Sequence, residues 1–255
     1  MGLRRRLGGG RKPAPAPDPP PSAPQDPQGT VRRDVVITVD PVRLPGELAE
    51  PPGAIGVVVF AHGSGSSRLS PRNVAVARVL NGRRIATLLF DLLTDSEAED
   101  RANVFDIGLL AARLEAATKW LATRPGFERL PVGLFGASTG AAAALVAAAH
   151  LRIGIAAVVS RGGRPDLAGA ALESVTVPTL LIVGGRDVDV LELNRQAERR
   201  LRGRTALEVV PGAGHLFEEL GALEKVAVLA ADWLEPIFEE SWREPPGRSR
   251  PRAGA

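Results

Sequence analysis

The chain has no cysteine and only three histidines among its 255 residues. The absence of cysteine excludes disulfides and any thiol nucleophile. The three histidines are scattered and give none of the ligand spacings that are typical of metal sites, so we expect no metal and no cofactor. The alanine-rich run near position 145 is too short to span a membrane, and the N-terminal region lacks the apolar stretch of a secretory signal. A cytoplasmic location without membrane association is therefore the expectation.

Positive charge is confined to the two ends of the chain. The formal net charge is +3, yet residues 1–33 carry seven Lys or Arg against two Asp, and residues 241–255 carry four Arg against one Glu. This leaves residues 34–240 with a net charge of −5. An acidic body does not attract a polyanion as a whole, so we expect no nucleic-acid partner for the folded core.

Composition also divides the chain into three parts. Residues 1–33 are rich in Pro and Arg, and residues 13–27 contain almost no large apolar side chain, which predicts a disordered arm. Residues 241–255 form a basic tail, for which we expect disorder as well. Residues 34–240 are long enough for one α/β domain with a large core.

The most specific motif is Gly136-Ala137-Ser138-Thr139-Gly140, which follows an apolar run and precedes an alanine-rich run. This context is typical of a nucleophile elbow, in which a serine occupies a strained turn between a strand and a helix. The two glycines allow the strand and the helix to approach closely. A tight strand-to-helix turn with a capping serine is the structural alternative.

A serine nucleophile requires a base, and the base requires an acid that orients it. His215, in the glycine-rich segment 211–217, is the candidate base, whereas His150 falls near the end of a helical pattern and is expected at the surface. The acid is expected after a core strand and between the serine and the histidine. Asp187 meets both conditions, and Asp189 is its alternative. Asp187 could equally cap the helix that follows it.

Two more side chains are candidates for substrate binding. His62 follows an early apolar strand in the segment His62-Gly63-Ser64-Gly65, where a role in shaping the loop is favoured over a direct catalytic one. Arg161 is expected at the carboxyl edge of the sheet, where it could hold a carboxylate or phosphate of the substrate. A salt bridge from Arg161 to Asp166 or to a neighbouring loop is the favoured alternative. Arg68, Arg72 and Arg186 have the same ambiguity.

Apolar runs alternate with helical patterns along the body of the chain. Strands are predicted at 35–39, 57–60, 85–90, 132–135, 155–159, 179–183 and 206–210. Helices are predicted near 74–80, 107–121, 141–151, 191–201 and 222–238. This alternation predicts a mostly parallel sheet of about seven to eight strands with helices on both faces. The interval between 159 and 179 has room for one short helix but for no large cap domain.

The four motifs at His62, Ser138, Asp187 and His215 occur in an order that resembles the α/β-hydrolase superfamily. The chain is similar to the small, lidless members grouped with dienelactone hydrolases, and the resemblance covers most of residues 35–238. Dienelactone hydrolase itself has a cysteine at the elbow, so its substrate is not carried over. The resemblance implies an oxyanion hole formed by the backbone N–H groups of Thr139 and Ser64.

These observations predict a serine hydrolase that cleaves carboxylic ester or related acyl bonds, with Ser138, His215 and Asp187 as its triad. Thioesterase, lactonase and peptidase activities would use the same groups. The expected partner is a small acyl substrate, and an anionic one if Arg161 contacts it. The alternative is a catalytically silent binding module with the same fold, for which the proline-rich arm could provide the contact segment. The oligomeric state does not follow from the sequence.

Overall fold

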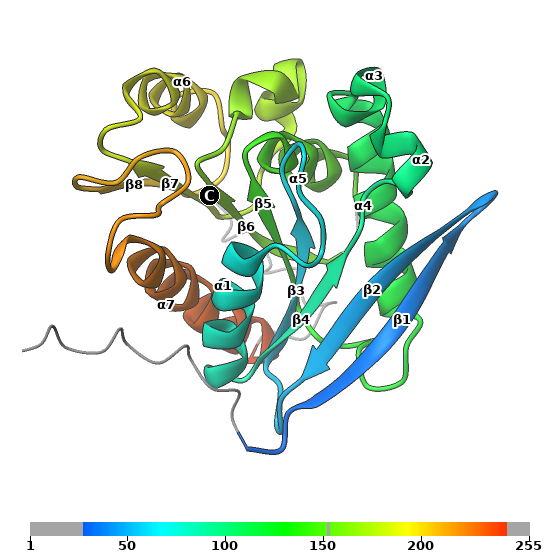
Figure 1. Ribbon diagram of the computed structural model, residues 1–255. Helices are drawn as coiled ribbons and strands as arrows, with labels where there is room; N and C mark the ends of the chain where they lie inside the picture. The colour runs from blue at the N-terminus through cyan, green and yellow to red at the C-terminus, as the bar shows by residue number, and fades with distance from the viewer. Residues whose placement is uncertain (1–27, 152–153, 244–255) are drawn as a thin grey trace, which may run out of the picture.

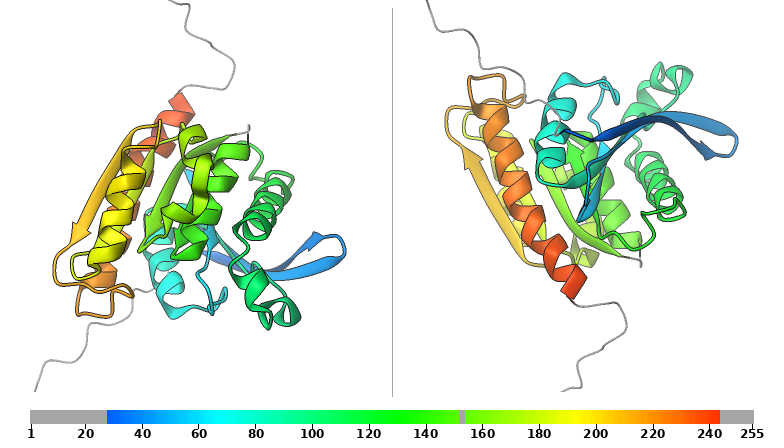
Figure 2. Two further views of the ribbon diagram at one scale, coloured as in Figure 1. Left: turned by 90° about the horizontal axis from the view of Figure 1, so that it is seen from above. Right: turned by 90° about the horizontal axis from the view of Figure 1, so that it is seen from below.

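The computed structural model describes residues 28–151 and 154–243, which form one eight-stranded sheet with helices on both faces (Figures 1 and 2). The strand order is β1-β2-β4-β3-β5-β6-β7-β8. The first two strands form an antiparallel hairpin at one edge, and all later pairs are parallel except β2 with β4. The strands are β1 (Val31–Val39), β2 (Val42–Glu50), β3 (Gly56–Ala61), β4 (Ile85–Phe90), β5 (Val132–Ala137), β6 (Ile155–Arg161), β7 (Thr179–Gly184) and β8 (Thr205–Val210).

Helices cover the sheet in two layers (Figure 2). On one face, α1 (Pro71–Gly82) packs against α7 (Ala222–Arg243). On the other face, α4 (Ile107–Ala122) packs against α5 (Thr139–His150), and α5 against the 3-10 helix η1 (Pro165–Ser174), which in turn contacts α6 (Val188–Glu198). Two short helices, α2 (Asp95–Ala98) and α3 (Arg101–Val104), precede α4.

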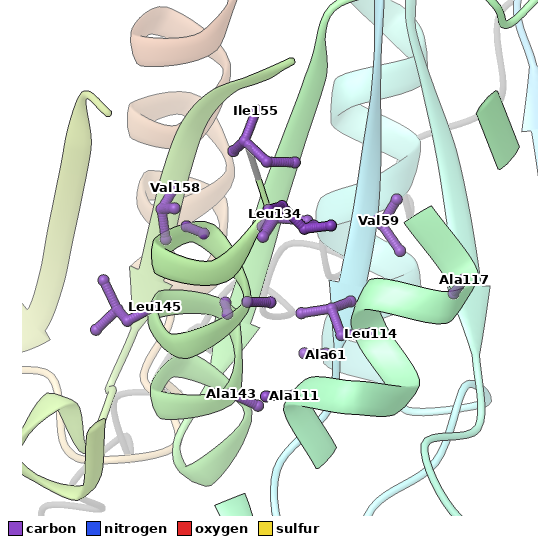
Figure 3. Close-up of a cluster of buried hydrophobic side chains, with 14 of the residues drawn as sticks. Val59, Ala61, Ala111, Leu114, Ala117, Leu134, Ala143, Leu145, Ile155 and Val158 are labelled. Carbon is purple, nitrogen blue, oxygen red and sulfur yellow. The ribbon is translucent and has the colours of Figure 1, made fainter. Parts of the chain in front are cut away.

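The central strands are buried on both faces because each layer of helices covers one set of alternating side chains. Val57 and Val59 of β3 belong to the cluster beneath α4 and α5, whereas Val58 and Phe60 belong to the cluster beneath α1 and α7. Figure 3 shows the first cluster, in which Leu114 of α4 lies toward the side chains of β3 and β5. Two-sided burial explains why these strands are continuous apolar runs in the sequence.

The predicted fold class is confirmed, and the main difference lies at the hairpin edge. β2 was not predicted, because Pro45 and Gly46 interrupt its pattern and both residues are rare inside strands. It forms because it pairs with β1 on one side and with β4 on the other. Two helices of four residues, α2 and α3, were also missed.

The folded body extends slightly beyond the predicted boundaries of 34 and 240. β1 begins at Val31, and α7 continues to Arg243. Most of the arm and tail that we expect to be disordered, residues 1–27 and 244–255, lie outside the described residues. Within the described ranges, no helix has the length and apolar character required to cross a bilayer.

Helix α7 is anchored at the amino ends of the central strands. An added Cβ at Gly56 would lie 2.2 Å from the Phe238 ring, and one at Gly133 would lie 3.1 Å from it. The Phe238 side chain is fully buried. The two glycines therefore provide the space into which the ring packs.

We expect Phe238→Ala to lower the free energy of unfolding by about 3–5 kcal/mol, because it removes a large buried ring and leaves a cavity. Leu220→Ala is the control, since Leu220 is 91 % exposed and its truncation should change stability by at most about 0.5 kcal/mol. Chemical denaturation of both variants measures the difference. Equal stabilities would contradict the role assigned to Phe238.

Candidate active site

Ser138 lies at the turn between β5 and α5 with a backbone conformation that is rare for a residue with a side chain. Its φ is 51° and its ψ is −119°. Hydrogen bonds hold the turn: the Ser138 N–H donates to the Arg161 carbonyl at 3.2 Å, and the Ser138 carbonyl accepts from Ala141 and Arg164, each at 3.1 Å. Such strained conformations persist only where the surroundings fix them, and they gather at functional sites.

The glycines of the motif are required by backbone contacts on either side of the serine. An added Cβ at Gly136 would lie 2.3 Å from the Ala141 Cα atom. At Gly140 it would lie 2.2 Å from the Ala61 carbonyl oxygen and 2.5 Å from that of His62. The start of α5 therefore lies directly against the end of β3.

His215 and Asp187 are hydrogen-bonded to each other, with 2.6 Å between Nδ1 and Oδ2. Asp187 precedes α6 but makes no capping hydrogen bond with its side chain, and Asp189 lies in the first turn of α6. A Cβ at Gly184 would lie 2.5 Å from the carbonyl oxygens of Ala213 and Gly214, so this glycine allows the histidine loop to lie against the end of β7.

The His215 ring lies beside Gly162, close to the point where the end of β6 is hydrogen-bonded to Ser138. Its Cε1 atom is 3.7 Å from the position of a Cβ at Gly162, and Gly162 follows Arg161, whose carbonyl accepts from the Ser138 N–H. The described residues show no hydrogen bond between the Ser138 hydroxyl and His215. Catalytic hydrogen bonds are often long without substrate and shorten in the complex.

Glu219 holds the histidine loop, and sequence reasoning did not identify it. Its carboxylate accepts from the Gly214 N–H at 3.0 Å and forms an ion pair with Arg186. The Gly214 hydrogen bond, and to a smaller extent Arg186, lower the pKa of Glu219. The only sequence signal for this role is its position four residues after His215.

His62 is buried and uses both ring nitrogens within the protein. Its Nε2 accepts from the Leu92 N–H at 3.1 Å, and its Nδ1 lies 3.0 Å from the Gly63 carbonyl oxygen. The Leu92 bond requires an unprotonated Nε2, so Nδ1 is the nitrogen that donates to Gly63. Burial lowers the pKa of His62, which favours this neutral form. The histidine thereby ties the loop after β3 to the loop after β4.

The loop after β3 lies against Ser138. A Cβ at Gly63 would lie 3.1 Å from the Ser138 Cβ atom. The next residue, Ser64, donates its N–H to the Thr139 hydroxyl oxygen at 3.0 Å, and Thr139 is only 3 % exposed. The two residues that the resemblance assigns to the oxyanion hole are therefore adjacent, but the Ser64 N–H is bonded to a side chain.

A cavity of about 390 Å³ opens beside these two residues. Its walls come from the loops after β3 and β4, from α2, α3 and α4, and from Thr139, and they combine apolar and polar side chains. Ser138, Asp187 and His215 are not among the lining residues. The ion pair between Arg68 and Asp91 lies in this wall. This volume suits a small molecule or one arm of a larger one.

Arg161 is 7 % exposed and has no carboxylate partner among the described residues. One guanidinium nitrogen donates to the Asn73 side-chain oxygen at 3.1 Å, and its Nε has no hydrogen-bond partner. Burial and the nearby Arg72 lower the pKa of Arg161 to about 10. The salt bridge that we favoured between Arg161 and Asp166 is not present, because Arg164 pairs with that aspartate.

The remaining sequence candidates are all engaged elsewhere. Arg72 pairs with Glu218 at 3.5 Å, and its Nε also lacks a partner. His150 is largely exposed, and its Nδ1 atom lies 3.0 Å from the Glu115 carboxylate. Among the described residues, no group of three or more His, Asp or Glu side chains could hold a metal ion.

We expect Gly140→Ala to lower the free energy of unfolding by about 3 kcal/mol, because the new methyl group would collide with two backbone carbonyls. In a domain of this size the melting temperature should fall by roughly 10 °C. Gly82→Ala is the matched control, since a Cβ at Gly82 meets nothing within 4 Å. Thermal unfolding compares the two variants. Equal melting temperatures would contradict the steric role assigned to Gly140.

The chain is similar to solved structures over most of its length. Dienelactone hydrolase from Anabaena variabilis is 54% identical to this chain, with a TM-score of 0.78 over 80% of this chain and 97% of that one. Est1E from Butyrivibrio proteoclasticus has a TM-score of 0.69 at 17% identity, over 81% of this chain and 99% of its own. The second likeness shows the fold alone.

Two curated Mycobacterium tuberculosis proteins, provisionally named phosphoribosyl transferases, are 63% identical over 201 residues. The match covers 79% of this chain but 45% of theirs, so the chain spans less than half the length of these relatives. A family model described as the dienelactone hydrolase family matches residues 84–235. The chain thus has the α/β-hydrolase fold and belongs to the dienelactone hydrolase family.

Proposed function

We propose that the protein cleaves carboxylic esters or related acyl bonds through an acyl-enzyme on Ser138, with His215 as base and Asp187 as acid. The observation that carries this proposal is the 2.6 Å bond between His215 and Asp187 at the edge of the sheet where the strained Ser138 lies. Membership of a hydrolase family supports it. The thioesterase, lactonase and peptidase activities use the same chemistry and fall within the proposal.

The reaction begins with proton transfer from the Ser138 hydroxyl to His215 Nε2 as the serine oxygen attacks the substrate carbonyl carbon. Asp187 fixes the ring orientation through Nδ1 and stabilises the imidazolium. His215 then returns the proton to the leaving group, which departs and leaves the acyl group on Ser138. A water molecule, deprotonated by the same histidine, releases the acid product.

Arg161 is proposed to bind an anionic group of the substrate. A buried guanidinium without an anion is costly, because burial removes hydration that no opposite charge replaces. With a pKa of about 10, Arg161 remains protonated at neutral pH. Its neighbour Arg72 adds positive charge rather than compensating for it. A carboxylate or phosphate would provide the missing counter-charge and a planar match for the guanidinium.

His62, also predicted to bind substrate, is assigned a supporting part. Both of its ring nitrogens are engaged with backbone groups, although the residue lines the cavity. The proposal therefore uses His62 to position the loop and not to contact the reacting atoms. No cofactor enters the proposed reaction.

The name of the mycobacterial relatives does not transfer to this chain. More than half of each relative lies outside the match, and the matched part is similar to hydrolases. The competing proposal is a silent binding module with the same fold. A hydrogen-bonded histidine and aspartate beside a strained serine favour catalysis, because binding alone does not require that arrangement.

Asp187→Asn is expected to lower kcat on an activated ester by about 10⁴-fold, because the asparagine no longer holds the productive histidine tautomer. Asp189→Asn is the matched control and should keep wild-type activity. Ester hydrolysis and labelling by a fluorophosphonate probe provide two readouts, and Ser138→Ala should abolish both. A folded wild type that neither turns over nor labels would support the binding module instead.

The role of Arg161 is tested with two nitrophenyl esters that differ only in a terminal carboxylate on the acyl chain. We expect Arg161→Gln to raise KM for the anionic ester at least about tenfold, since a charge-assisted hydrogen bond is lost. The neutral ester should be nearly unaffected. Arg164→Gln, which removes a partly exposed arginine that already has a partner, is the control. An equal loss on both esters would assign Arg161 a structural role.

A further inference from the structure

The oxyanion hole implied by the resemblance differs from the one that the structure presents. The Ser64 N–H, expected to face the substrate, donates to the Thr139 hydroxyl oxygen at 3.0 Å. A backbone amide has one hydrogen, so a bond to Thr139 removes this donor from a carbonyl oxygen in the cavity. The Thr139 hydroxyl therefore takes up the one hydrogen that the Ser64 amide could offer to a substrate.

The hydroxyl that takes this hydrogen bond keeps a proton of its own. A threonine hydroxyl can accept and donate at the same time. The hydrogen bonds among the described residues show Thr139 Oγ1 accepting from Ser64 and provide no protein acceptor for its proton. Because an accepted hydrogen bond polarises the O–H group, the Ser64 amide makes this hydroxyl a stronger donor.

Thr139 is adjacent to the proposed nucleophile. It follows Ser138 directly, is 3 % exposed, and lines the 390 Å³ cavity together with Ser64. As the first residue of α5, it also has a backbone N–H with no acceptor inside the helix. One residue thus provides two donors next to the nucleophile.

We propose that the Thr139 hydroxyl donates directly to the oxyanion and that the Ser64 N–H acts from behind it as a positioning group. This assignment rests on the proposed acyl transfer by Ser138. As the Ser138 oxygen bonds to the carbonyl carbon, its proton passes to His215 and the carbonyl electron pair moves onto the oxygen. That oxygen accepts from the Thr139 N–H and from the Thr139 O–H. When the pair returns, the leaving group departs with the proton from His215.

Thr139→Val tests the proposal because valine keeps the branched shape and removes the hydroxyl. We expect kcat on nitrophenyl acetate to fall about 100- to 1000-fold, the usual loss for one oxyanion donor, with KM within about threefold. Thr139→Ser should retain most of the activity. If Thr139 merely blocks Ser64, the valine variant frees that amide, and kcat stays level or rises. That result would overturn the proposal.

A trifluoromethyl ketone, which forms a charged tetrahedral adduct with the serine, provides the second readout. Its inhibition constant should rise by the same factor by which kcat/KM falls in Thr139→Val, since both report the oxyanion. A loss of kcat without weaker inhibition would indicate a structural role and would overturn the assignment. Melting temperatures and circular dichroism verify that both variants fold.

The same experiment separates this inference from the function on which it rests. If the wild type hydrolyses the ester, Ser138→Ala does not, and Thr139→Val equals the wild type, the hydrolase stands and only the role of Thr139 is wrong. If the wild type shows neither turnover nor fluorophosphonate labelling, the proposed function fails and the assignment of Thr139 fails with it.

Discussion

The contact between the start of α5 and the end of β3 is the constraint on which the rest of the site depends. Gly140 brings the helix against the carbonyls of Ala61 and His62, and no residue with a Cβ could take its place without a shift of backbone. The same approach places Gly63 against Ser138 and Ser64 against Thr139. A steric requirement at one glycine therefore sets the geometry around the reacting carbonyl.

Some polar groups around this contact have a hydrogen-bond or charge partner within the described part of the protein, and others lack one. Both ring nitrogens of His62 are hydrogen-bonded, Arg68 is paired with Asp91, and Glu219 holds the histidine loop through the Gly214 N–H. These groups position loops. Arg161 and Thr139 differ, because one has no counter-charge and the other has a hydroxyl proton without a protein acceptor. The binding and catalytic proposals rest on this difference.

The sequence predicts the fold well wherever burial leaves a strong pattern. The central strands are continuous apolar runs, and the elbow motif places strand, turn and helix in order. β2 is not predicted from the sequence, because it is stabilised by pairing with β1 and β4 and not by the strand propensity of its own residues. Its Pro45 and Gly46 are typical of a loop when the neighbouring strands are not known.

The candidate site is predictable in composition but not in its pairings. The bond between His215 and Asp187 requires the loops after β7 and β8 to meet, which the parallel pairing of those strands provides. Arg161 and Val159 point to the same face of the sheet, the one covered by α1. Asp166 lies in the first turn of η1, which belongs to the helices on the other face. Their proximity in the sequence is therefore misleading. The contact of Ser64 with Thr139 joins residues 75 positions apart and has no local signal.

Phe238 of α7 packs against glycines at the amino ends of β3 and β5. This contact lies at the opposite end of the sheet from Ser138, Asp187 and His215. Substitutions in the loops at the carboxyl edge therefore leave the Phe238 packing untouched, although close contacts at Gly63, Gly140 and Gly184 limit how far those loops can move. In evolutionary terms this separates the packing at the amino ends of the strands, which forms the frame, from the loops at the carboxyl edge, which form the rim of the candidate site. New substrate preferences can arise at that rim through a few substitutions without compensating changes in the frame.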